Sequence, residues 1–111
     1  MKKKRAEGFT EKLHSFFNEV WDKREDETGS CYCYETGREL PGFIFRSNST
    51  CYHHVLPKNK YPEFAFEEWN IVILHPKVHM QVESNLDKCP KVKELTKKLK
   101  NERCWINTKR V

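Results

Sequence analysis

Two apolar runs joined by a long loop decide the fold of this chain. They are Tyr52-His53-His54-Val55-Leu56-Pro57-Lys58 and Trp69-Asn70-Ile71-Val72-Ile73-Leu74-His75-Pro76-Lys77-Val78-His79. Each run is short, rich in β-branched and aromatic residues, and bounded by proline, which is typical of β-strands. We therefore expect residues 52–56 and 69–74 to be the arms of an antiparallel hairpin. A connection of about a dozen residues between two strands is long and is typical of a functional loop.

A helix is expected directly after the second run. His75-Pro76 is typical of a helix start, because proline at the first helical position loses no hydrogen bond, and His75 is expected to cap or flank that start. The helix then places His79 and Glu83 on one face, because residues four apart are neighbours on a helix. The apolar positions that follow at helical spacing are Val78, Val82 and Leu86.

The order strand, loop, strand, helix carries a His pair, an Asn sixteen residues after His54, and a His nine residues after that Asn. This pattern resembles the HNH, or ββα-metal, nuclease family over about residues 31–88. The segment Cys33-Tyr34-Glu35-Thr36-Gly37-Arg38-Glu39-Leu40 is also similar to the Cys-x-x-Thr-Gly-x-x-Leu turn that precedes the His pair in many phage-type members. The joint spacing is specific, whereas a His pair alone means little.

The resemblance implies a role for each polar residue of the pattern. His54 would be the general base that deprotonates water, and Asn70 would hold the loop carrying His54 or, as in some members, lie at the metal. His53 and His79 would be metal ligands, with Glu83 as a third. Many members have Asp where His53 stands, and this chain follows the variant of the nuclease colicins. The implied cofactor is one divalent ion, Mg²⁺ foremost, with Mn²⁺, Ni²⁺ and Zn²⁺ left open because imidazole also suits transition metals.

Plainer interpretations stand beside these roles. Adjacent residues of a regular strand face opposite sides, which argues against His53 and His54 acting together in such a strand. Glu83 has the ordinary alternative of a solvated helix residue. Lys58 would contact the scissile or a neighbouring phosphate by resemblance, and an exposed loop charge is its plain alternative.

The composition indicates one folded domain spanning residues 1–111. Charged residues make up 33% and aromatic residues 13%, which excludes a disordered polymer and a membrane protein. No apolar run approaches the length of a membrane span or of a signal-peptide core. We therefore expect a cytoplasmic protein, in the host cell cytoplasm if the chain is phage-encoded.

The segments around this core are expected to add helices and a second short hairpin. Residues 1–9 are predicted to be a flexible basic arm. An amphipathic helix is predicted from Thr10, its N-cap, to a point before Gly29; it carries His14, to which no chemistry is assigned. Residues 31–40 are expected to form a strand and a turn in which Gly37 has a positive φ, and residues 43–45 a further strand.

Residues 89–111 are predicted to form a basic C-terminal helix and tail. Residues 88–111 hold nine Lys or Arg against two Glu, a net charge of +7 in a chain whose total is +5. Such an excess is typical of a surface that binds a polyanion, and a solvated surface helix is the plain alternative. The residues of this helix expected to bind DNA are Lys97, Lys98 and Lys100.

The five cysteines favour buried thiols over a disulfide framework or a structural zinc. Their number is odd, and their spacings lack the Cys-x-x-Cys knuckles that bind zinc in several HNH relatives. They are Cys31, Cys33, Cys51, Cys89 and Cys104.

Taken together, these patterns predict an α+β fold with a ββα-metal core, an additional short β-hairpin, and flanking N- and C-terminal helices. The predicted function is a metal-dependent HNH endonuclease that nicks or cuts DNA, of the small stand-alone kind found in bacteriophages and bacteria. The leading alternative is a non-catalytic nucleic-acid-binding module that retains the fold and acts with a larger phage enzyme. A structural Cys/His zinc domain would need thiolate ligands that the spacings do not supply. The choice of DNA over RNA, sequence specificity and oligomeric state are left open.

Overall fold

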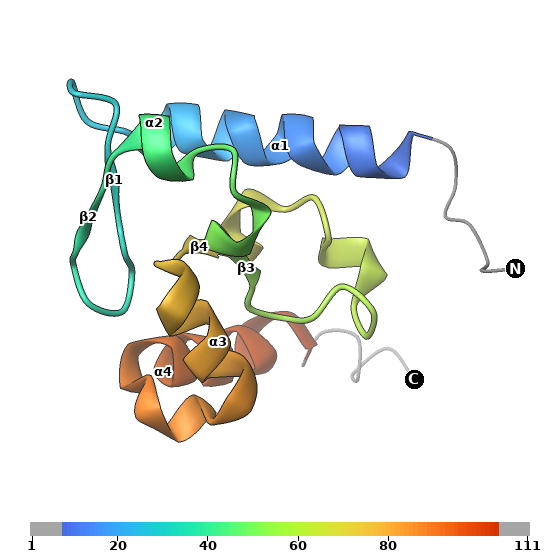
Figure 1. Cartoon of the computed structure of the whole chain (residues 1–111). Helices are drawn as coiled ribbons and strands as arrows, with labels where there is room; N and C mark the ends of the chain where they lie inside the picture. The colour runs from blue at the N-terminus through green and yellow to red at the C-terminus, as the bar shows by residue number, and fades with distance from the viewer. Residues whose placement is uncertain (1–7, 105–111) are drawn as a thin grey trace, which may run out of the picture.

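The computed structural model describes residues 8–104, so most of the predicted basic arm and the chain beyond residue 104 lie outside the described residues. Within that part, the chain is an α+β protein with four α-helices and two two-stranded antiparallel sheets. The elements are α1 (Phe9–Arg24), β1 (Cys31–Tyr32), β2 (Glu39–Leu40), α2 (Gly42–Phe45), β3 (Tyr52–His54), β4 (Ile71–Ile73), α3 (Pro76–Ser84) and α4 (Pro90–Leu99). Figure 1 shows the β3–β4 hairpin between α1 on one side and α3 and α4 on the other. None of the described helices combines the length and apolar character needed to cross a bilayer.

Helix α1 packs its apolar stripe onto the β3–β4 hairpin. Phe17 stacks on Tyr52 of β3 with ring centroids 4.3 Å apart. The predicted N-cap, Thr10, is wrong: the helix begins at Phe9, and Gly8 holds the N-cap position with a φ of 83°, a left-handed conformation that glycine adopts without strain. The buried residues of the stripe are Leu13, Phe17, Val20 and Trp21.

The second hairpin pairs β1 with β2, and Gly37 in its turn has a φ of 78°, as predicted. The strand predicted at residues 43–45 is wrong, because this segment is the short helix α2. Pro41 starts a helical turn there, and its carbonyl oxygen accepts hydrogen bonds from the N–H groups of Ile44 and Phe45. Phe43 is 92% exposed, so the segment also lacks the buried face that would favour a strand.

Strands β3 and β4 form the predicted antiparallel hairpin, in which His53 lies opposite Val72. Both strands are shorter than the predicted arms. After His54 the chain leaves the ladder, and the N–H of Leu56 donates to the side chain of Asn70 in place of a strand partner. The loop between the strands contains two 3₁₀ turns, at Pro62–Phe64 and Glu68–Asn70.

Helix α3 begins at Pro76, as predicted. Nδ1 of His75 accepts a hydrogen bond of 3.0 Å from the backbone N–H of Lys77, which confirms His75 as its cap. The helix ends at Ser84, and Leu86 opens a separate 3₁₀ turn rather than extending the apolar stripe.

Helix α4 is held at its start by the β1–β2 turn. Both carboxylate oxygens of Glu35 accept backbone N–H groups there, from Lys91 at 3.3 Å and from Val92 at 2.9 Å. A carboxylate at a helix N-terminus is favourable, because it satisfies N–H groups that have no partner within the helix. After Leu99 the chain continues as a π-helical turn, Lys100–Cys104.

Four of the cysteines are buried free thiols, as predicted for this chain: Cys31, Cys33, Cys51 and Cys89. Burial raises the pKa of Cys31 to about 12 and that of Cys51 to about 11, so both remain protonated near neutral pH. A protonated thiol is a poor metal ligand, and these groups act as small apolar residues of the core.

Candidate metal and catalytic site

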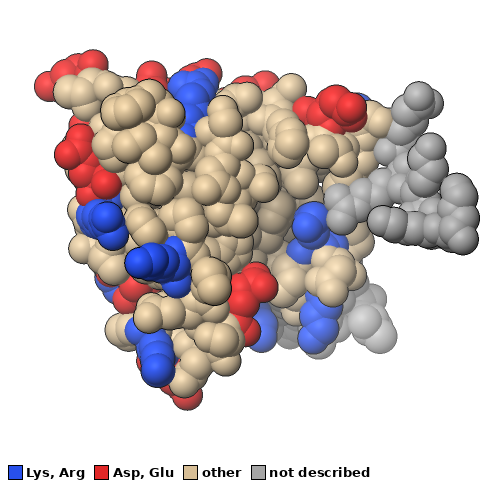
Figure 2. Space-filling model, viewed as in Figure 1, with Lys and Arg blue, Asp and Glu red and all other residues tan. Residues whose placement is uncertain are grey.

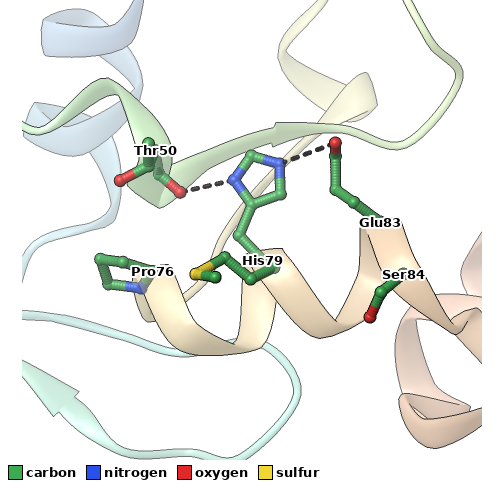
Figure 3. Close-up of a pocket in the computed structure, with 6 residues that line it drawn as sticks. Thr50, Pro76, His79, Glu83 and Ser84 are labelled. Carbon is green, nitrogen blue, oxygen red and sulfur yellow. Dashed lines mark hydrogen bonds and ion pairs between the residues drawn. The ribbon is translucent and has the colours of Figure 1, made fainter.

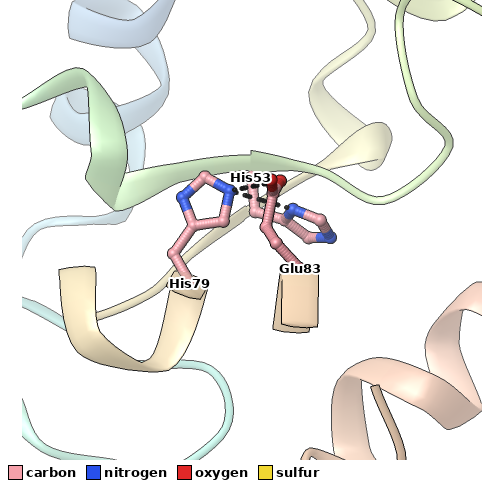
Figure 4. Close-up of side chains that lie close together, drawn as sticks. All are labelled: His53, His79 and Glu83. Carbon is pink, nitrogen blue, oxygen red and sulfur yellow. Dashed lines mark hydrogen bonds and ion pairs between the residues drawn. The ribbon is translucent and has the colours of Figure 1, made fainter. Parts of the chain in front are cut away.

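Three side chains, His53, His79 and Glu83, converge between β3 and α3 (Figure 4). His53 is the middle residue of β3, and the other two come from successive turns of α3. Their ligand atoms all lie within 4.8 Å of one another, and no other three His, Cys, Asp or Glu side chains are grouped in this way among those that the structure describes. The fold therefore brings together the three residues that the resemblance assigns to the metal.

The ring of His79 is held by the backbone that leads into β3. Its Nδ1 lies 2.6 Å from the carbonyl oxygen of Thr50 (Figure 3). A carbonyl oxygen can only accept, so Nδ1 carries a proton, and Nε2 is the ring nitrogen that faces the cluster. That Nε2 lies 3.3 Å from a carboxylate oxygen of Glu83 and 3.3 Å from Nδ1 of His53. Nε2 thus points into the cluster, where it donates to the Glu83 carboxylate when it is protonated and presents a lone pair to a cation when it is not.

His53 is kept neutral by its surroundings. Only 9% of the residue is exposed, and this burial, helped by the neighbouring rings of His79 and His54, lowers the pKa of His53 to about 4. Near neutral pH its imidazole carries no charge. A neutral imidazole is the form that binds metal ions.

The geometry of the cluster fits a bound cation. Two imidazole nitrogens on one tetrahedral ion, each at about 2.0–2.1 Å from it, lie about 3.3–3.4 Å apart. Nδ1 of His53 and Nε2 of His79 are 3.3 Å apart, and Glu83 adds an anionic oxygen at the same spot. The hydrogen bond from His79 to the carbonyl of Thr50 is the kind of outer contact that fixes the tautomer of metal-binding histidines. Two nitrogens and one carboxylate oxygen are compatible with magnesium and with transition metals, so the ion type stays open.

His54 is oriented in a similar way but stands apart from the cluster. Its Nε2 lies 2.9 Å from the carbonyl oxygen of Ala65 in the long loop, so Nε2 is the donor and the neutral ring carries its lone pair on Nδ1. Burial lowers the pKa of His54; the bond to Ala65 opposes this effect, and the positive charge of Lys58 adds to it. A neutral imidazole with a free ring nitrogen has the chemistry of a general base.

Asn70 holds the loop that follows His54. It is fully buried; its Oδ1 accepts from the N–H of Leu56 at 2.8 Å, and its Nδ2 donates to the carbonyl oxygens of Leu56 at 3.0 Å and Phe64 at 3.1 Å. Of the two places that the resemblance leaves open for this residue, the loop is the one observed, and Asn70 is not part of the metal-binding group. Its role is therefore to hold the loop that follows His54.

A hollow of about 590 Å³ opens beside these residues, between α1 and α3. His53, His54, His79 and Glu83 all line it, which answers the objection that neighbouring strand residues face opposite sides. His54 is the last residue of β3, where the regular ladder ends. Lys58 also lines this hollow, so it lies on the same side of the molecule as the metal-binding group and His54.

The basic C-terminal residues lie elsewhere. Lys97, Lys98 and Lys100 are exposed on the end of α4 and on the turn after it, and none of them lines the hollow. On the face shown in Figure 2, Lys and Arg are spread among Asp and Glu and do not gather into one patch. The structure thus leaves the predicted DNA-binding role of these lysines a prediction.

Neither family models nor curated proteins nor solved structures include a match to this chain. Two residues that the sequence patterns did not single out contribute to the site, Thr50 and Ala65. Both act through backbone carbonyl groups, which leave no signal in a sequence.

Proposed function

We propose that this chain is a metal-dependent endonuclease of the HNH type, in which β3, β4 and α3 form the ββα-metal core. One observation carries the proposal: a metal-binding group of two imidazoles and a carboxylate shares a single hollow with a third imidazole whose Nε2–H is held by a carbonyl. The residues in this arrangement are the ones that the His, Asn and His spacing selects in the sequence. Agreement between spacing and contacts supports the assignment more strongly than either alone.

Hydrolysis of a phosphodiester needs an activated water and positive charge near the phosphate. His54 supplies the base. Its ring is neutral near pH 7, its Nε2–H is engaged by Ala65, and its Nδ1 is left to take a proton from water. The carbonyl of Ala65 also stabilises the imidazolium that forms when this proton is taken up.

His53, His79 and Glu83 are the proposed ligands of one divalent ion. Such an ion, when bound, supplies positive charge that stabilises the crowded anionic transition state of phosphoryl transfer. The two imidazoles are already aimed, because Thr50 fixes the ring of His79 and β3 holds His53 against it. Little ordering is then required on binding, which favours affinity.

Asn70 and Lys58 complete the proposed site without taking part in proton transfer. Asn70 ties Leu56 to Phe64, so the segment that follows His54 is held beside the part of the loop whose Ala65 carbonyl contacts the His54 ring. Lys58 lines the hollow and can pair with a phosphate of the substrate. The proposed substrate is DNA, which follows from the resemblance to HNH nucleases; the net charge of +5, with an excess of Lys and Arg at the C-terminal end, favours a nucleic acid of either kind.

Cleavage of supercoiled plasmid by purified protein tests the proposal, with Mg²⁺, Mn²⁺, Ni²⁺ or Zn²⁺ added separately over a range of pH. We expect nicked or linear products with at least one ion and none with a chelator. His54→Ala should abolish cleavage and leave metal affinity unchanged, because this residue is the base and not a ligand. Free imidazole added to His54→Ala should restore part of the rate.

His54→Gln is the matched control for the structural role of His54, its hydrogen bond to the carbonyl of Ala65. Its side-chain amide can still donate to the carbonyl of Ala65 but cannot act as a base, so it should fold like the parent and remain inactive. Plasmid left intact by the parent with all four ions contradicts the enzyme proposal. DNA binding that persists in such a protein would favour the non-catalytic module instead.

A further inference from the structure

Helix α1 forms one wall of the hollow that contains the histidine site. Leu13 and Phe17 turn inward, and Phe17 lies 5.9 Å from the ring of His54, measured between ring centroids. Thr10 and His14 are four residues apart and therefore share a face of the helix. Both of them line the hollow, and both are exposed. His14 thus stands at the open edge of the same hollow as the site.

The charges around this hollow favour an anionic occupant. Glu83 is the only carboxylate among the described residues that line it, and Glu83 belongs to the metal-binding group. The remaining ionisable side chains are those of Lys58, His14, the three histidines of the site and Tyr52, whose pKa is raised by burial so that it stays uncharged near neutral pH. Once a cation engages Glu83, no negative charge is left on these walls. A groove with one sign of charge concentrates ligands of the opposite sign.

The metal-binding group also lies between two hollows and is not at the closed end of either. A second hollow, of about 400 Å³, has Pro76 and Met80 on its walls (Figure 3). Thr50, His79 and Glu83 line both hollows. A linear polymer can therefore run past the metal-binding group, with one part of it in each hollow. This arrangement suits an internal bond of a polymer better than a terminal group.

We propose that the larger hollow is a binding subsite for the sugar-phosphate backbone of DNA next to the bond that is cut, with His14 of α1 and Lys58 of the long loop contacting a flanking phosphate. This inference rests on the proposed function and extends it, because it names a residue on an element outside the ββα unit. His14 is a positioning residue: it contacts the substrate backbone away from the reacting atoms. Removing it should weaken DNA binding and raise KM, and leave kcat nearly unchanged.

A charge series at position 14 tests the subsite. The Kd of a short fluorescein-labelled DNA duplex is measured by anisotropy with Mg²⁺ present and each variant made in the His54→Ala background, so that the metal-binding group can be filled and nothing is cleaved. We expect the Kd to rise in the order His14→Lys, His14→Ala, His14→Glu, by about threefold for each unit of charge at physiological salt. The same order is expected in KM for DNA cleavage, with kcat constant.

Ser15→Lys and Ser15→Glu are the matched controls. Ser15 is exposed on the same helix, one residue away, and does not line the hollow. Equal effects at positions 14 and 15 would mean that only the net charge of α1 matters, and would overturn the subsite. A series at position 14 that changes kcat and leaves Kd constant would also overturn it. Parent protein that binds DNA but cuts none contradicts the proposed nuclease alone, whereas parent protein that binds no DNA contradicts both.

Discussion

Replacing the fully buried Asn70 should destabilise the fold far more than an ordinary polar substitution. Its side chain satisfies three backbone groups, the N–H and carbonyl of Leu56 and the carbonyl of Phe64. Asn70→Ala removes all three partners at once. The two groups of Leu56 are buried, and each buried group left without a partner costs about 1–3 kcal/mol. Allowing for relaxation and water entry, we expect a loss of about 3 kcal/mol in the free energy of unfolding.

Asn70→Asp should be more harmful still, although it keeps the size of the side chain. An ionised carboxylate can accept from the N–H of Leu56, but its second oxygen would face two carbonyl oxygens that need a donor. The variant must either bury this repulsion or take up a proton. We expect its loss of stability to reach about 4 kcal/mol or more at neutral pH, and to shrink as the pH is lowered and the carboxyl becomes protonated.

Urea unfolding followed by circular dichroism measures these differences, and thermal unfolding provides a second reading. A loss of about 3 kcal/mol corresponds to a decrease in Tm of roughly 12 °C in a domain of this size. Asn59→Ala is the control, because Asn59 is exposed in the same loop, and its removal should change stability by less than about 0.5 kcal/mol. One ordinary hydrogen bond contributes about 1 kcal/mol to stability. An Asn70→Ala variant whose free energy of unfolding lies within about 1 kcal/mol of that of the parent would therefore refute this reasoning.

Three further predictions concern the metal, pH and the basic helix. His53→Ala and His79→Ala should each weaken metal binding by at least about tenfold in a calorimetric titration, and excess metal should partly restore their activity. His53→Asp should stay active and shift the metal preference toward Mg²⁺. Unchanged metal affinity in both Ala variants would mean that the cluster is structural. Without metal, the free energy of unfolding of the parent should fall by about 2 kcal/mol between pH 7 and pH 4.5, and that of His53→Gln should not show this fall. In the unfolded chain His53 takes up a proton at its ordinary pKa of about 6.5, whereas burial holds its pKa in the folded state at about 4. Proton binding therefore favours the unfolded state in this pH range. Equal pH profiles for parent and His53→Gln would contradict the buried neutral imidazole. Neutralising Lys97, Lys98 and Lys100 should weaken DNA binding equally for all sequences. It should also reduce the slope of log Kd against log salt concentration, by about 0.9 for each phosphate that the protein no longer neutralises. An unchanged slope would show that these lysines face away from DNA.

Local features of the fold followed from residue patterns because they depend on neighbours in the chain. His75-Pro76 predicted the start and the cap of α3, and the helix confirmed both. Gly37 adopts the positive φ that its turn requires. The same kind of reasoning failed at residues 43–45, where three apolar residues suit a strand or a helical turn equally well. The hydrogen bonds that the Pro41 carbonyl accepts, together with the exposure of Phe43, favour the helical turn.

The site divides in the same way between what the sequence determined and what the tertiary structure decided. The sequence by itself determined that His79 and Glu83 share a face of a helix and that a His pair lies in the first strand, since the helical repeat and the strand repeat follow from backbone geometry. That this strand ends at His54, before the predicted end at Leu56, was decided by the tertiary structure. Only the tertiary structure decided which ring nitrogens carry protons and that Asn70 binds the loop. The carbonyls that fix the rings of His79 and His54 lie 29 and 11 residues away in the sequence. Every residue has a carbonyl group, so no side-chain pattern marks the one that a fold brings into contact.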